Sequence, residues 1–226
     1  MNDTLYTIST WVIPAILAIT LHEAAHGFVA LRFGDKTAWQ QGRVTLNPLK
    51  HIDPFGTIVM PGLLIFLHSP FLFGYAKPVP VNFRALNNPR RDMVWVAAAG
   101  PATNILMALA AGLLAHLALL LQLPAAKWAV LNIENAILIN VLLAVFNMLP
   151  LPPLDGGRVA VGLLPDSLAL PLARLEPYGM PILLGLIFLL PLIGNQLDMD
   201  LNVIGWVLSE PVNWLVNFVI RITGNG

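Results

Sequence analysis

Residues 10–33 read TWVIPAILAITLHEAAHGFVALRF, an apolar run with two histidines and a glutamate in its second half. The run is long enough to cross a bilayer, which takes about 20 residues. His22 and His26 are four residues apart, so on a helix both imidazoles project from one face and can bind one metal ion. Glu23 follows His22 and can act as a general base on a metal-activated water. The stretch therefore predicts a membrane helix that carries a metal site.

The HEAAH pattern at residues 22–26 is too rare to be a coincidence of composition. With five histidines and four glutamates in the chain, random placement gives roughly 0.002 expected matches. Each ionisable group at membrane depth also costs about 3 kcal/mol or more, so such groups mark function. Three of them within five residues indicate a functional site.

The composition sets the class of protein. Of 226 residues, 57% are hydrophobic and 11% are charged, against roughly 25% charged in a soluble domain. The net charge is zero, so we expect no nucleic-acid partner. The chain has no cysteine, which excludes thiolate metal ligands and leaves histidine, aspartate and glutamate. The lipid bilayer is the expected surrounding.

Four to five segments are long and apolar enough to span a membrane. The chain is therefore expected to be an all-α polytopic protein of the cell membrane. The last segment contains Glu210 and Pro211, so it either spans or lies flat at the interface. The expected spans cover residues 5–33, 93–121, 130–149, 180–193 and 201–220.

Residues 55–75 are apolar but broken by two proline-containing pairs, so they either span or enter and leave by the same side. Basic residues collect in cytoplasmic loops, and this rule decides between the alternatives. With a re-entrant segment and an outer N-terminus, only Lys127 lies outside, and the other basic residues, Arg90 and Arg221 among them, lie inside. A spanning segment would divide them between both sides. We expect the re-entrant segment, with the active site towards the cytoplasmic side.

Two short segments, residues 42–48 and 77–83, alternate in hydropathy as strands do. We expect them to form a small membrane-associated β-sheet beside the metal site. The chain is expected to be a single membrane-embedded domain, residues 1–226, with a core at 5–160 and C-terminal helices at 178–221. No basic residue precedes the first apolar run, so it is expected to be a retained span.

A zinc ion needs a third protein ligand and leaves a fourth position for water. Glu23 is followed by no nearby glutamate, so an aspartate has to supply this ligand. Three candidates fall at loop or span ends among basic residues and are expected to be solvated: Asp35, Asp53 and Asp92. Asp155 differs, because it follows the prolines that stop the third span and precedes two glycines that allow a tight turn.

The expected depths of His22 and Asp155 agree. At 1.5 Å per residue, His22 lies about 24 Å along the helix from Tyr6, in the inner part of a hydrocarbon core about 30 Å thick. Asp155 follows a span that runs from outside to inside. The two residues can therefore meet near the inner face.

Taken together, HEAAH and NMLPLPPLDGG at residues 147–157 resemble the site-2 protease family of intramembrane metalloproteases. The similarity extends to GYAKPVPVN at 74–82 and AAGPATN at 98–104, and covers a small form without PDZ or CBS domains. The resemblance implies hydrolysis of peptide bonds in or near the transmembrane segments of membrane protein substrates. It implies one zinc ion, with Glu23 as the base, and Asn147 in contact with the substrate or the tetrahedral intermediate. The implied zinc ligands are His22, His26 and Asp155.

Asn104 in the AAGPATN segment has two interpretations. Its amide can hydrogen-bond the HEAAH helix or contact the substrate, or it can simply join two helices. The function also has two rivals, since buried His, Glu and Asp occur in transporters and in relatives that have lost activity. No pair of broken helices typical of transporters is apparent, and every catalytic residue type is present.

Overall fold

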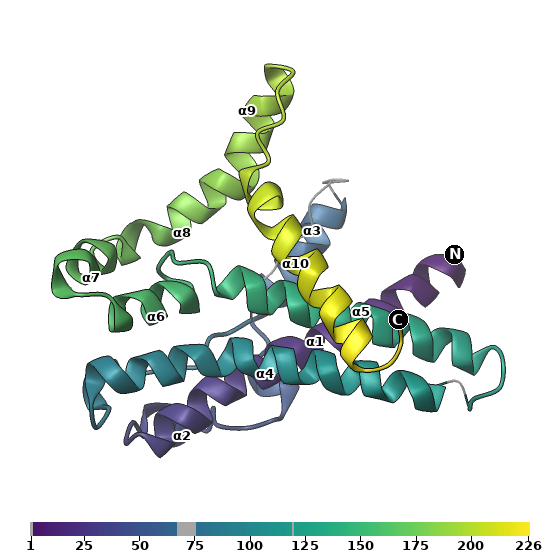
Figure 1. Cartoon of the computed structure of the whole chain (residues 1–226), viewed down its shortest axis with the longest axis horizontal. Coiled ribbons are helices and arrows are strands. Elements are labelled where there is room, and N and C mark those ends of the chain that lie inside the picture. Colours follow the sequence, from purple (N-terminus) through teal and green to yellow (C-terminus); the bar gives the residue numbers. More distant parts are fainter. Residues whose placement is uncertain (1, 67–75, 119) are drawn as a thin grey trace.

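The computed structural model describes residues 2–66, 76–118 and 120–226, and all regular structure within these ranges is helical (Figure 1). Several helices have proline in their first turn, where its missing N–H costs nothing. The helices are α1 (Asn2–Arg32), α2 (Thr37–Gln40), η1 (Pro48–Lys50), η2 (Pro54–Val59), α3 (Met60–Phe66), η3 (Phe83–Ala85), α4 (Pro89–Ala118), α5 (Ala125–Asn147), α6 (Asp155–Leu163), α7 (Asp166–Ala173), α8 (Glu176–Leu184), η4 (Gly185–Leu189), α9 (Leu190–Gln196) and α10 (Val203–Ile222).

Five of the described helical segments are long and apolar enough to cross a membrane, which confirms the expected multi-pass membrane protein. The prolines inside them do not end the helices, because neighbouring helices can satisfy the freed backbone groups. The segments are Leu5–Arg32, Pro89–Ala118, Ala125–Asn147, Glu176–Gln196 and Val203–Ile222.

The centre of the molecule is the packing of α1, α4 and α5 against one another (Figure 1). Small side chains fill the contacts between these helices, so the backbones approach closely, as is usual inside membranes. They are buried, and they include Ala18, Ala24, Ala97, Ala108 and Ala144. This packing brings the metal-binding face of α1 against α4.

The helix α10 packs along α4 and α5 through Leu208, Val212 and Val219 rather than lying apart from the bundle. Its C-terminal end contacts the C-terminal end of α4: His116 Nε2 donates to the carbonyl of Thr223 at 2.7 Å, and Asn225 donates to Gly112. The helix α10 therefore runs in the same direction as α4.

This direction corrects the expected position of Arg221. The sequence predicts Arg221 at the same end as Arg90, because each expected span reverses the direction of the chain. In the structure, Arg221 lies near the C-terminal end of α4, opposite Arg90 at its N-terminal end. The segment Glu176–Gln196 packs on the bundle through its first half, and α9 then projects away from it (Figure 1).

The expected β-sheet is wrong for the residues that the structure describes, since neither 42–48 nor 77–83 forms a strand. Two prolines in the second segment lack the N–H groups that a ladder needs. Most of the other backbone hydrogen bonds of this segment go to side chains, while the Lys77 N–H donates to the His51 carbonyl at 2.9 Å. Arg43 donates to the Lys77 carbonyl at 2.6 Å, and Asn82 N–H donates to Asp35 at 2.7 Å.

The predictions for the other aspartates are also partly wrong. Asp35 and Asp92 are buried, 1% and 3% exposed, rather than solvated. Both accept backbone N–H groups: Asp35 from Thr37 and Asn82, and Asp92 from Asn88. Asp35 thus joins the turn after α1 to the end of the segment 77–82, and Asp92 fixes the backbone just before α4.

The expected re-entrant segment is described only in its first half. Asp53 caps a helix that runs from Pro54 to Phe66 as η2 and α3. Residues 67–75 lie outside the described ranges. The re-entrant path therefore stays a prediction.

Candidate active site

His22 and His26 lie on the face of α1 that packs against α4. Both are buried, 7% and 9% exposed, with their ring centroids 4.7 Å apart. Their Nε2 atoms approach to 3.0 Å. The spacing of four residues thus brings two ring nitrogens to one point, as the helix period requires.

Asp155 reaches the same point from the first turn of α6. Its Oδ2 lies 3.2 Å from Nε2 of His22 and 3.3 Å from Nε2 of His26. The two following glycines allow this position, because a Cβ on Gly156 would clash with the Met148 carbonyl and one on Gly157 with the Pro152 nitrogen. The turn after α5 therefore folds tightly enough to bring Asp155 back to α1.

The hydrogen bonds of the two imidazoles decide where their protons lie. Nδ1 of His22 is 2.6 Å from Asn104 Oδ1, and Nδ1 of His26 is 2.7 Å from the Val96 carbonyl. These oxygens can only accept, so each ring carries its proton on Nδ1. Both Nε2 atoms then present lone pairs towards each other and towards Asp155.

Three electron-rich atoms facing one another at 3.0–3.3 Å repel unless a cation lies between them. Asp155 Oδ2 is buried and makes no hydrogen bond to any residue in the described ranges. A tetrahedral zinc site with bonds of about 2.0–2.1 Å has ligand atoms about 3.3 Å apart. The group His22, His26 and Asp155 therefore fits zinc, the metal expected from the sequence.

Gly100 on α4 forms the wall behind the two imidazoles. A Cβ at this position would lie 2.5 Å from His22 Cε1 and 2.5 Å from His26 Nε2. This glycine is not among the site residues expected from the sequence. The backbone of α4 at Gly100 therefore lies directly against the two imidazole rings.

Glu23 does not belong to the ligand group. Its Oε2 accepts the backbone N–H of Val79 at 2.7 Å, which holds the carboxylate beside the segment 77–82. Arg43 in turn holds that segment by donating to the carbonyls of Lys77 and Pro78. The sequence offered no signal for these contacts, because they are made by backbone groups far apart in the chain.

A cavity of about 210 Å³ opens beside the ligands. Glu23, His22 and Asn147 contribute its polar atoms, and Asn147 also donates to the Leu143 carbonyl of its own helix at 3.0 Å. Asn104 is fully buried and is not among the residues that line the cavity. The apolar lining consists of Ile19, Ala76, Leu143, Phe146, Leu154, Met180, Leu183, Leu184 and Ile187.

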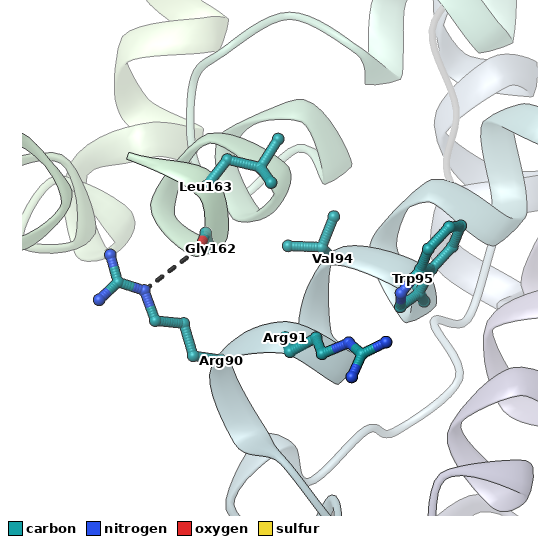
Figure 2. Close-up of a pocket in the computed structure, with 6 residues that line it drawn as sticks. All are labelled: Arg90, Arg91, Val94, Trp95, Gly162 and Leu163. Atoms are coloured by element: carbon teal, nitrogen blue, oxygen red, sulfur yellow. Dashed lines mark hydrogen bonds between the residues drawn. The ribbon is translucent and has the colours of Figure 1, made fainter. Parts of the chain in front are cut away.

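A second hollow lies where α4 begins and α6 ends (Figure 2). It holds none of the metal ligands. Figure 2 shows Arg90 turned towards the end of α6, where its Nε donates to the Gly162 carbonyl at 3.2 Å. The same guanidinium bonds the Leu164 carbonyl and pairs with Asp166 at 2.6 Å. Arg90 thus fastens α6, and with it Asp155, to α4.

The chain is similar to curated zinc metalloproteases. It is 43% identical over 185 residues to "Putative zinc metalloprotease YwhC" of Bacillus subtilis (strain 168), which covers 80% of each chain. It is 34% identical over 159 residues to "Putative zinc metalloprotease Rip2" of Mycolicibacterium smegmatis, and covers 56% of that protein. It is 35% identical over 142 residues to the Rip2 protein of Mycobacterium tuberculosis (strain ATCC 25618 / H37Rv), and covers 52% of it. No protein-family profile matches the chain, and no solved structure matches it.

Proposed function

The chain belongs to the site-2 protease family of zinc metalloproteases, and we propose that it hydrolyses peptide bonds in or near the transmembrane segments of membrane proteins. One observation carries this proposal. The bare ligand atoms of His22, His26 and Asp155 meet beside Glu23, at an apolar cavity among helices able to cross a bilayer.

Zinc at such a site supplies Lewis acidity, which acidifies water and polarises a peptide carbonyl. Glu23 takes the proton from the attacking water. Its Oε2 is occupied by the Val79 N–H, which leaves Oε1 for the proton. The carboxyl group then passes this proton to the leaving amine. Asn147 lines the same cavity, which supports a contact with the substrate or the tetrahedral intermediate.

The lining of the cavity supports an apolar substrate segment. A peptide in a helix has its carbonyls bonded and shielded, so the substrate has to unwind locally before attack. We place the protein in the cell membrane with its N-terminus outside and the site towards the cytoplasm. Arg32, Arg90 and Arg158 support this orientation, because they lie at or beyond the ends of candidate spans on the side of the site.

The first prediction separates the chemistry from metal binding. Glu23→Gln keeps the size of the side chain but cannot take a proton at neutral pH. We expect the zinc content to stay at one per chain while cleavage falls by about 10²–10⁴-fold. The measurement is zinc content and cleavage of single-span peptides by the two proteins reconstituted in vesicles.

Glu134→Gln is the matched control, since Glu134 is an exposed glutamate on the spanning helix α5. It should cleave at the wild-type rate. Wild-type cleavage by Glu23→Gln would remove Glu23 from the mechanism. Transport of zinc without cleavage by any form would favour the transporter alternative instead.

A further inference from the structure

Two buried asparagine amides connect α5 to the metal ligand His22. Asn104 accepts from Nδ1 of His22 at 2.6 Å through Oδ1, and its Nδ2 donates to Asn140 Oδ1 at 2.8 Å. Asn140 Nδ2 in turn donates to the Ala136 carbonyl at 2.8 Å. The chain of hydrogen bonds therefore crosses three helices, from α5 through α4 to α1.

The donor and acceptor in each of these hydrogen bonds follow from the Ala136 carbonyl, where the series ends. The Ala136 carbonyl can only accept, so Asn140 must present its NH₂ group there and its oxygen to Asn104. Asn104 then presents its NH₂ group to Asn140 and its oxygen to His22. His22 must therefore carry its proton on Nδ1, which leaves Nε2 free to bind the metal.

Because both asparagines are buried, reversing either amide would cost hydrogen bonds that solvent cannot replace. Asn104 and Asn140 are 0% and 1% exposed, so neither amide can exchange its partner for solvent. An unsatisfied polar group at such depth is costly, and a reversed amide would leave several. Asn104 has one further partner, the Ala18 carbonyl, at a longer 3.3 Å. Asn140 thus supplies the shorter of the two bonds that hold the Asn104 amide in its orientation.

We propose that Asn140 is a positioning residue for the zinc site, which acts through Asn104 to keep His22 in its metal-binding tautomer. The inference rests on the zinc site of the proposed function but needs no substrate. Without the Asn140 oxygen, only the longer bond to the Ala18 carbonyl opposes a turn of the Asn104 NH₂ group towards His22. The proton of His22 then moves to Nε2, where it blocks the metal.

The test compares Asn140→Leu with Asn104→Leu and with Asn135→Leu. Asn135 is the matched control, since it lies on the same helix and also bridges to another helix, donating to the Thr10 carbonyl at 3.0 Å. Zinc affinity is measured by chelator competition. The tautomer of His22 is read from ¹⁵N spectra of the metal-free protein.

We expect Asn104→Leu to weaken zinc binding by about 10- to 100-fold, and Asn140→Leu by up to about tenfold, because it acts one step further away. Asn140→Leu should also shift His22 towards the Nε2–H form, and the double variant should bind zinc no more weakly than Asn104→Leu alone. Asn135→Leu should leave the zinc affinity and the tautomer unchanged.

Equal effects of Asn140→Leu and Asn135→Leu, or an unchanged tautomer in Asn140→Leu, would overturn the proposal and leave Asn140 as a bridge between helices. If Asn140→Leu does not fold, Asn140→Ala is measured in the same way and has to give the same two changes. A wild-type protein that binds zinc but cleaves no membrane peptide would contradict the proposed function and leave this inference standing.

Discussion

At the scale of single residues, the metal site depends on the lack of a side chain at position 100. Gly100 lets α4 press its backbone against the imidazoles of His22 and His26. A methyl group there would occupy the space of the rings themselves. A residue that makes no bond to the metal thus controls whether the ligands can meet.

We predict that Gly100→Ala loses zinc although every ligand remains. The new Cβ would lie 2.5 Å from His22 and His26, so the imidazoles have to move apart. Zinc content and the thermal unfolding of the purified protein are measured together. Gly185→Ala is the control, because its added Cβ would meet no atom of the described residues within 4 Å beyond its chain neighbours and its own helix backbone. A Gly100→Ala protein with full zinc would show that the rings can shift without cost.

The grouping of His22, His26 and Asp155 could be predicted from the sequence because its signals are local. The period of a helix brings His22 and His26 together, and the glycines after Asp155 reveal a tight turn. Asn140 carried the same kind of signal, a polar residue in an apolar span, and was missed. Its partner is distant in sequence, so its role depends on helix packing that no local pattern contains.

At the scale of elements, the segment 77–82 takes the place of the expected strand. The N–H groups of Val79 and Asn82 bond to Glu23 and Asp35, and the Lys77 carbonyl bonds to Arg43, rather than to a neighbouring strand. Hydropathy alternation indicated an extended segment. It did not indicate that the prolines prevent a strand ladder, so that several other backbone groups of the segment bond to side chains.

We predict that Val79→Pro lowers cleavage while zinc stays bound. Proline between Pro78 and Pro80 is compatible with extended backbone but removes the N–H that Glu23 accepts. A hydrogen bond to a charged group contributes about 1.5–3 kcal/mol, so we expect the rate to fall by about tenfold or more. Val79→Ala keeps the N–H and tests the loss of side-chain packing alone. Equal rates for the two variants would show that the hydrogen bond is unimportant.

At the scale of the whole molecule, the apolar spans could be predicted from the sequence, but the direction of α10 could not. Each apolar helix can be identified by its length and composition. The direction of α10 depends on the contact of Thr223 and Asn225 with the end of α4. The rule that successive spans alternate cannot foresee a helix such as Glu176–Gln196, which leaves the bundle.

We predict that Arg221 and Lys127 lie on one side of the membrane and Arg90 and Arg158 on the other. The chain has no cysteine, so single cysteines at these positions can be labelled one at a time in sealed vesicles. Positions 127 and 221 should react with an impermeant reagent from the same face. Reaction of position 221 together with position 90 would contradict the direction of α10 and restore the alternating arrangement.

The metal ligands come from the first helix of the core and from the turn after its last, and this has a consequence for biosynthesis. While the ribosome is still making α5, His22 and His26 are already in the membrane but have no carboxylate beside them. Two imidazoles hold zinc far more weakly than a complete set. The nascent chain is therefore expected to bind zinc only weakly while α5 is still being made. The complete group of His22, His26 and Asp155 forms only when Asp155 has emerged and folded back.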